Sequence, residues 1–181
     1  CISGRENWLY MEVANPALAS LSYEIIRAPK FGLRISHPQQ RGYQHLCSDF
    51  LQKLSQDFGF LVLKDAPIGD QQGLVDFCED YGEIYYWSFG PLNVIKPADD
   101  PKIIVGSTEK IPLHWDLSML PHSDKNVQKN PSFAASVFML YCKNPPAKGE
   151  GQTTVVDSRT ALKLAGQQKV RQWKETSITY N

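Results

Sequence analysis

The sequence predicts a mixed α/β fold with a mainly β core, a jelly-roll-type double sheet that carries helices on its outer side. Two observations favour this class. Amphipathic helical segments occupy 37–58 and about 70–81, and after Gly82 the chain changes to short β-prone runs separated by Pro, Gly and Asp. The alternating βα order of a Rossmann fold is absent. "KGEGQTT" (148–154) leads into a strand pattern, where a phosphate-binding loop would open a helix.

Each predicted helix has a capping residue. Within 37–58 the apolar positions recur at helical spacing: Leu46, Phe50, Leu54 and Phe58. Gly59 is a natural C-terminal cap, and "FLVLK" (60–64) follows as a short strand. Asp70 is the expected N-cap of the second helix, which Gly82 ends.

The second half of the chain is read as strands followed by one helix. The predicted strands are "EIYYWSF" (83–89), "KIIVGS" (102–107), "SFAASVFMLYCK" (132–143) and "QTTVVD" (152–157). Ser158 is a possible cap for a helix over 159–174, after which "SITYN" (177–181) returns to strand. No repeat or linker divides the sequence, so 1–181 is predicted to be a single domain.

Composition indicates which kinds of ligand and which cellular location are expected. Lys+Arg and Asp+Glu both count 19, so no global field attracts nucleic acid or an anionic membrane, and a small-molecule partner is expected. No run is long and apolar enough for a membrane helix, and no signal peptide opens the chain. The four cysteines are widely spaced without a CxxC pair, which favours buried thiols and a reducing, cytoplasmic location.

The segment "PLHWDLSML" (112–120) contains the chemistry-bearing pattern. In an extended segment alternate side chains share a face, so His114 and Asp116 point the same way while Trp115 points to the other side. An imidazole and a carboxylate suit a divalent metal, and a second histidine would complete the 2-His-1-carboxylate triad of non-haem Fe(II) oxygenases. The alternative for this triplet is a polar pair on a strand surface.

Several short motifs around this triplet, in their order and spacing, resemble the taurine dioxygenase-like family of Fe(II)/2-oxoglutarate-dependent dioxygenases. The motifs that carry the resemblance are "DFGFLVLKDAPI" (57–68), "FCEDYGEIYYW" (77–87), the HxD at 114–116, "FMLYC" (138–142), Gly151 with Thr153, and "DSRTAL" (157–162). Together they cover roughly residues 40–175.

The resemblance implies a double-stranded β-helix and an enzyme that uses Fe(II), 2-oxoglutarate and O2. It implies that His114 and Asp116 are catalytic metal ligands and that the Thr153 hydroxyl binds a carboxylate of 2-oxoglutarate. The alternative for Thr153 is a β-branched strand residue beside Thr154. Because halogenating relatives replace the carboxylate ligand by a small residue, Asp116 indicates hydroxylation or desaturation.

The aromatic segment "YYWSFGPLN" (85–93) stands where family members build their substrate loop. Trp87 and Phe89, together with Tyr85 and Tyr86, are predicted to form an aromatic wall that contacts substrate. This departs from the polar loop of taurine-specific members and favours an amino acid or natural-product intermediate. The alternative is that these aromatic residues fill the core of the sheet.

The family's remaining iron ligand, a distal histidine, and the arginine that pairs with 2-oxoglutarate have no counterpart here. No histidine follows His122, and Arg159 and Arg171 fall in the predicted helix. We therefore expect a β-helix that is incomplete at its C-terminal side, the N-terminal part of a longer enzyme. The alternative is a non-catalytic half-fold that binds another molecule through its unpaired strand edges. Pairing of two copies through these edges would give a homo-oligomer.

Overall fold

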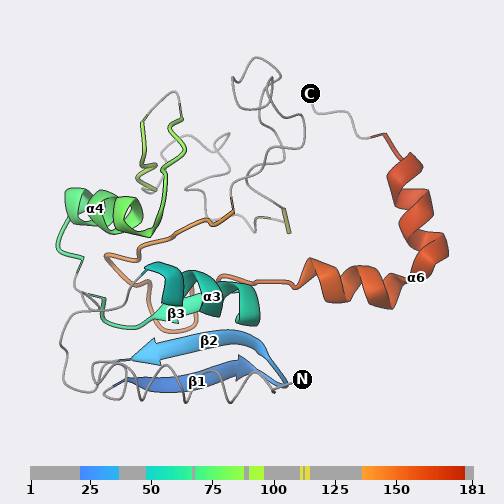
Figure 1. Cartoon of the computed structure of the whole chain (residues 1–181), viewed down its shortest axis with the longest axis horizontal. Coiled ribbons are helices and arrows are strands. Elements are labelled where there is room, and N and C mark those ends of the chain that lie inside the picture. The colour runs from blue at the N-terminus through green and yellow to red at the C-terminus, as the bar shows by residue number, and fades with distance from the viewer. Residues whose placement is uncertain are drawn as a thin grey trace. The chain divides into compact units, whose positions relative to one another are not determined.

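The computed structural model describes residues 21–36, 48–66, 68–87, 90–95, 111, 113–114 and 136–177 (Figure 1). The chain divides into two compact units, one made of Cys1–Pro67 with Gly149–Asn181 and the other of Ile68–Lys148. The described residues form a mixed α/β structure with one three-stranded sheet and three helices. The jelly roll and the single domain stay predictions.

The sheet belongs to the first unit and has the order β1-β2-β3. β1 (Ser22–Arg27) pairs antiparallel with β2 (Phe31–Ser36), and β3 (Leu61–Leu63) pairs parallel with β2. In this register Leu33 is the partner of both Ile25 and Leu61. Partners across a ladder share a face, so these apolar side chains form one side of the sheet.

Helix α3 (Ser48–Phe58) packs on the sheet and completes the core of the first unit (Figure 1). Its buried side chains are Phe50, Leu51, Leu54 and Phe58, at the helical spacing that the sequence shows. Below them Leu33 and Ile35 of β2 are 1% and 0% exposed. The predicted helix is thus confirmed from Ser48, and residues 37–47 lie outside the described residues.

A glycine permits the close contact between β2 and the segment that precedes β3. Gly32 has φ +74, and a Cβ there would stand 2.3 Å from Cζ of Phe60. The Phe60 ring therefore lies directly over the glycine, where it meets Phe31 edge-to-face with 5.1 Å between ring centroids.

The second unit contains α4 (Gln71–Tyr81), whose two ends are as predicted. Asp70 Oδ1 accepts the Gly73 N–H at 2.9 Å, and the Gly82 N–H donates to the Cys78 carbonyl at 3.0 Å. The segment 137–142, which is neither helix nor strand, contacts α4 and the residues before it. Met139 Sδ stands 3.5 Å from Cys78 Sγ, and the Tyr141 hydroxyl donates to the Ile68 carbonyl.

The structure differs from the predicted strand pattern in two respects. The β1–β2 hairpin was not predicted, and the described parts of the runs at 83–89, 132–143 and 152–157 are not strands, apart from an isolated bridge at Trp87. The runs at 102–107 and 178–181 lie outside the described residues. β-Propensity measures how well a side chain fits a pleated, half-buried surface. It does not specify a partner strand, so a β-prone run need not pair.

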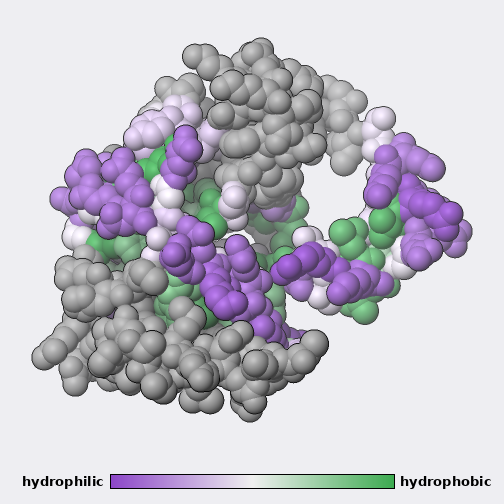
Figure 2. All heavy atoms as spheres, viewed as in Figure 1, coloured by the Kyte–Doolittle hydropathy of each residue, from purple (hydrophilic) through white to green (hydrophobic). Residues whose placement is uncertain are grey.

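Helix α6 (Ser158–Glu175) is capped by Asp157, not by Ser158 as predicted. The helix is kinked at Gly166, where φ is 78° and ψ 162°, and Figure 1 shows its axis turning between two helical pieces. Figure 2 shows apolar side chains beside polar ones on the visible surface of α6. The exposed apolar residues of this helix are Leu162, Leu164 and Trp173.

The cap of α6 should make the helix sensitive to acid. The Thr160 hydroxyl donates to Asp157 Oδ2 at 2.6 Å and the Arg159 N–H to Oδ1 at 3.0 Å. These hydrogen bonds, with that of Thr160 the strongest cause, hold the pKa of Asp157 below its usual range. Because the folded-state pKa is depressed, the stabilisation is present above the unfolded pKa and is lost as pH falls through the folded one.

We expect far-UV circular dichroism to show helix loss in this acid range, and an Asp157→Asn variant, which caps without titrating, to show less pH dependence. Identical acid titrations of the two proteins would contradict the assignment.

Within the part of the chain that the structure describes, no helix combines the length and the apolar character needed to cross a bilayer.

Candidate active site

The HxD segment is described only in part. His114 lies in the second unit with its side chain exposed, and it makes an interaction with its surroundings. Asp116 lies outside the described residues. Among the residues with a described placement, no group of three or more His, Cys, Asp or Glu side chains comes together. The pairing of His114 with Asp116 around a metal therefore stays a prediction.

Thr153, the predicted 2-oxoglutarate contact, belongs to the first unit. It lies on an irregular segment between Gly151, which has φ 59°, and the N-cap of α6, and its side chain is exposed. An exposed hydroxyl can donate to an anionic ligand, and the strand alternative is not borne out because 152–156 is not a strand. The binding role itself stays a prediction.

Trp87, a predicted substrate contact, pairs with Gly90 in an isolated β-bridge. Its N–H donates to the Gly90 carbonyl at 3.2 Å, and the Gly90 N–H donates back to the Trp87 carbonyl at 3.0 Å. The half-buried indole meets the Tyr85 ring edge-to-face, with 5.4 Å between centroids and 90° between planes. Phe89 lies outside the described residues.

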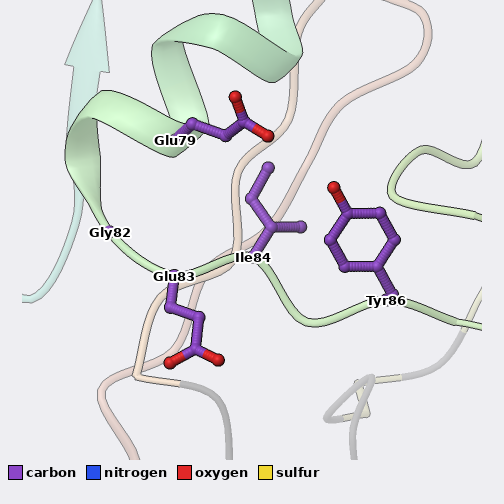
Figure 3. A pocket seen from close by; sticks show the side chains of 5 residues that line it. All are labelled: Glu79, Gly82, Glu83, Ile84 and Tyr86. Carbon is purple, nitrogen blue, oxygen red and sulfur yellow. The ribbon is translucent and has the colours of Figure 1, made fainter.

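The same loop borders an open depression of about 520 Å³ that sequence reasoning missed (Figure 3). Its lining comes from the end of α4 and the residues that follow: Glu79, Gly82, Glu83, Ile84 and Tyr86. In Figure 3 the side chains of Glu79, Ile84 and Tyr86 project to one side and that of Glu83 to the other. Tyr86 is 60% exposed. The sequence signal that could have indicated this depression is the i, i+2 spacing of Ile84 and Tyr86 after the helix cap, because such residues share one side of an extended chain.

The two described cysteines differ in environment. Burial raises the pKa of the Cys78 thiol, which packs against Met139, so this group is a poor nucleophile at neutral pH. Cys142 is exposed, contrary to the expectation of buried thiols. Cys1 and Cys47 lie outside the described residues.

A comparison with known protein families shows to which family this chain is related. The model of the family described as "Taurine catabolism dioxygenase TauD, TfdA family" matches residues 20–181. The chain belongs to this family. The match contains the HxD at 114–116, the Gly151–Thr153 segment and the aromatic loop.

Two curated relatives of this TauD/TfdA-family chain are similar to nearly its whole length. One is the tyrosine isonitrile desaturase of Pseudomonas aeruginosa, 26% identical over 167 residues, which covers 90% of this chain and 53% of that protein. The other is the 3-((Z)-2-isocyanoethenyl)-1H-indole synthase of Fischerella ambigua, 22% identical over 171 residues, which covers 94% of this chain and 59% of that protein. The chain spans a little over half the length of these relatives. No solved structure matches it.

Proposed function

We propose that this chain is part of an Fe(II)/2-oxoglutarate-dependent oxygenase that hydroxylates or desaturates a small organic molecule. The observation that carries the proposal is the family match over 20–181, with an HxD triplet inside it. The names of both relatives describe amino-acid-related isonitrile compounds, one of tyrosine and one of an indole. An amino acid or a natural-product intermediate derived from one is therefore the proposed substrate class.

The donor set of the triplet fits the metal. His114 supplies an imidazole and Asp116 a carboxylate, and this pair of ligand types suits Fe(II). When bound, iron and 2-oxoglutarate supply the activation of O2, coupled to oxidative decarboxylation of 2-oxoglutarate to succinate and CO2. His114 and Asp116 are the proposed metal ligands and catalytic residues, and the carboxylate ligand favours hydroxylation or desaturation over halogenation.

The other predicted residues position the organic ligands. Thr153 is the proposed hydrogen-bond donor to a carboxylate of 2-oxoglutarate. Trp87 and Phe89 are the proposed substrate contacts, whose rings exclude water from the reacting face. For the whole protein we propose the double-stranded β-helix, a cytoplasmic location and a small-molecule partner, with no nucleic acid or membrane.

One observation favours a second candidate, a non-catalytic interaction module that assembles through unpaired strands. Phe138 and Leu140 lie on the segment 137–142 beside α4 and are 61% and 64% exposed. Exposed apolar side chains are typical of a surface that associates with another chain, including in homo-oligomers.

The deciding experiment is an anaerobic titration, with Fe(II) and 2-oxoglutarate, of the purified whole protein of which this chain is proposed to be part. We expect the weak visible charge-transfer band of the Fe(II)–2-oxoglutarate chelate to appear and to saturate at one iron per chain. On exposure to O2, succinate should form. Zn(II) in place of Fe(II) is the control, since its filled d shell gives no such band. A flat spectrum together with concentration-dependent dimerisation would favour the interaction module.

A further inference from the structure

The depression at the C-terminal end of α4 is large enough for a small organic molecule. Its volume of about 520 Å³ falls in the range of about 300–1,000 Å³ that small-molecule sites occupy. Glu79 stands in the last turn of α4, and Ile84 and Tyr86 follow the helix in the chain. Figure 3 shows these three side chains projecting to the same side. A molecule in the depression would therefore meet a carboxylate, an alkyl group and a phenol ring together.

The charge around this depression is negative. Residues 65–95 contain no Lys, Arg or His, and their six acidic residues are Asp65, Asp70, Asp76, Glu79, Asp80 and Glu83. Glu79 and Glu83 are exposed, and neither forms an ion pair with any residue that the structure describes. An excess of one sign of charge around a hollow raises the local concentration of ions of the opposite sign. The depression therefore attracts cations.

The place of Glu79 in the helix also favours a cation. The C-terminal end of a helix carries partial negative charge from its unpaired carbonyl groups, so basic residues there are favourable and acidic ones unfavourable. The last turn of α4 holds Glu79 and Asp80 and no basic residue. Helix stability does not explain two carboxylates at this end. A bound cation would offset their charge and that of the helix end.

The other two side chains indicate the kind of cation. Tyr86 is 60% exposed, and the face of a tyrosine ring attracts an ammonium group. Ile84 offers an apolar contact, which suits a hydrocarbon chain and not a hydrated metal ion. Hard divalent metal ions need several oxygen ligands, whereas of the two lining carboxylates that of Glu79 alone projects to this side (Figure 3). An organic cation fits this combination of groups.

We infer that this depression binds a small alkylammonium ion, with the ammonium group at Glu79 and Tyr86 and the hydrocarbon chain on Ile84. The inference does not rest on the proposed function, because neither Glu79 nor Ile84 is a proposed contact of iron, 2-oxoglutarate or substrate. It adds a second ligand site to the chain. Exposed ion pairs contribute little, so the binding is weak and falls as the ionic strength rises.

The test is an NMR titration of the whole protein with labelled isoleucine methyl groups, in the absence of iron and 2-oxoglutarate. The Ile84 signal is identified by its loss in Ile84→Val. The probes are n-butylammonium and n-butanol, which share a hydrocarbon chain and differ in charge. Glu79→Gln removes the proposed carboxylate. Its matched control is Glu83→Gln, because Glu83 borders the same depression while its carboxylate projects to the other side (Figure 3). Tyr86→Leu removes the ring, and Tyr86→Phe keeps it.

We expect n-butylammonium to shift the Ile84 signal and to bind about 3- to 30-fold more tightly than n-butanol, the combined effect of one exposed ion pair and one cation–π contact. Glu79→Gln and Tyr86→Leu should each weaken the binding of n-butylammonium by about 2- to 5-fold, while Glu83→Gln and Tyr86→Phe retain it. An Ile84 signal that does not move, equal affinity for the two probes, or equal affinity of Glu79→Gln and Glu83→Gln for n-butylammonium overturns the inference.

Discussion

Replacing His114 by alanine should abolish the Fe(II)–2-oxoglutarate chelate and succinate formation. Loss of a residue that merely supports a ligand weakens metal affinity or activity by ~10–100-fold, so loss of a ligand itself should exceed about 100-fold. The side chain of His114 is exposed, and its truncation therefore leaves no cavity in the fold. The measurement is the anaerobic titration, followed by succinate after O2 is admitted. Asp116→Ala should likewise weaken the Fe(II)–2-oxoglutarate chelate and lower succinate formation.

The matched controls are His37→Ala and Asp80→Ala. His37 is a histidine outside the HxD triplet, and Asp80 is an exposed carboxylate on α4. Both proteins should keep the band and the succinate yield of the wild type. A His114→Ala protein with undiminished iron affinity and 2-oxoglutarate turnover would remove the ligand assignment while leaving family membership untouched.

The helices could be predicted because the relevant signals are local. Asp70 and Gly82 stand at the two ends of α4, and each makes the capping hydrogen bond that its residue type favours. The spacing of Phe50, Leu54 and Phe58 predicts a buried face, and that face is buried. At α6 the cap is off by one residue, because Asp157 and Ser158 are both good N-caps and the sequence does not rank them.

The sheet could not be predicted as well, because pairing joins distant residues. "FGLRIS" of β2 lies between its neighbours β1 and β3, and β3 reaches it only after the intervening helix α3. A signal for the hairpin existed in the two six-residue runs 22–27 and 31–36, which are separated by a short turn that contains Pro29. Nothing in a β-prone run such as 152–157 states whether a partner strand is present.

The candidate site was predicted by residue type and spacing, and its supporting geometry was not. The sequence marks Trp87 as an aromatic residue in a loop, whereas its backbone pairing with Gly90 and its ring contact with Tyr85 are known only from the structure. A glycine in a loop has many causes, and the sequence does not distinguish a positive φ, as Gly90 has, from the others. His114 and Asp116 remain predicted from the triplet and the family match.

Replacing Leu54 by alanine should destabilise the first unit by ~2–5 kcal/mol, the range typical for truncating a buried leucine. Leu54 is 2% exposed on the face of α3 that packs on the sheet, where β2 contributes Leu33 and Ile35. Truncation removes the packing contacts of the side chain and leaves a cavity between helix and sheet. The helix and the sheet are each held by their own backbone hydrogen bonds, so they move together only partly and the cavity is not filled.

The measurement for Leu54→Ala is the free energy of unfolding from urea titration, with hydrogen exchange of the β2 amides to locate the change in the first unit. Gln56→Ala is the matched control, since Gln56 is exposed on the same helix and should change the free energy of unfolding by less than about 0.5 kcal/mol. Leu54→Met, which nearly conserves volume, should cost less than ~1.5 kcal/mol. If Leu54→Ala and Gln56→Ala unfold at the same urea concentration, α3 does not pack on β2 as described, because a side chain in that interface cannot be truncated without loss of its contacts.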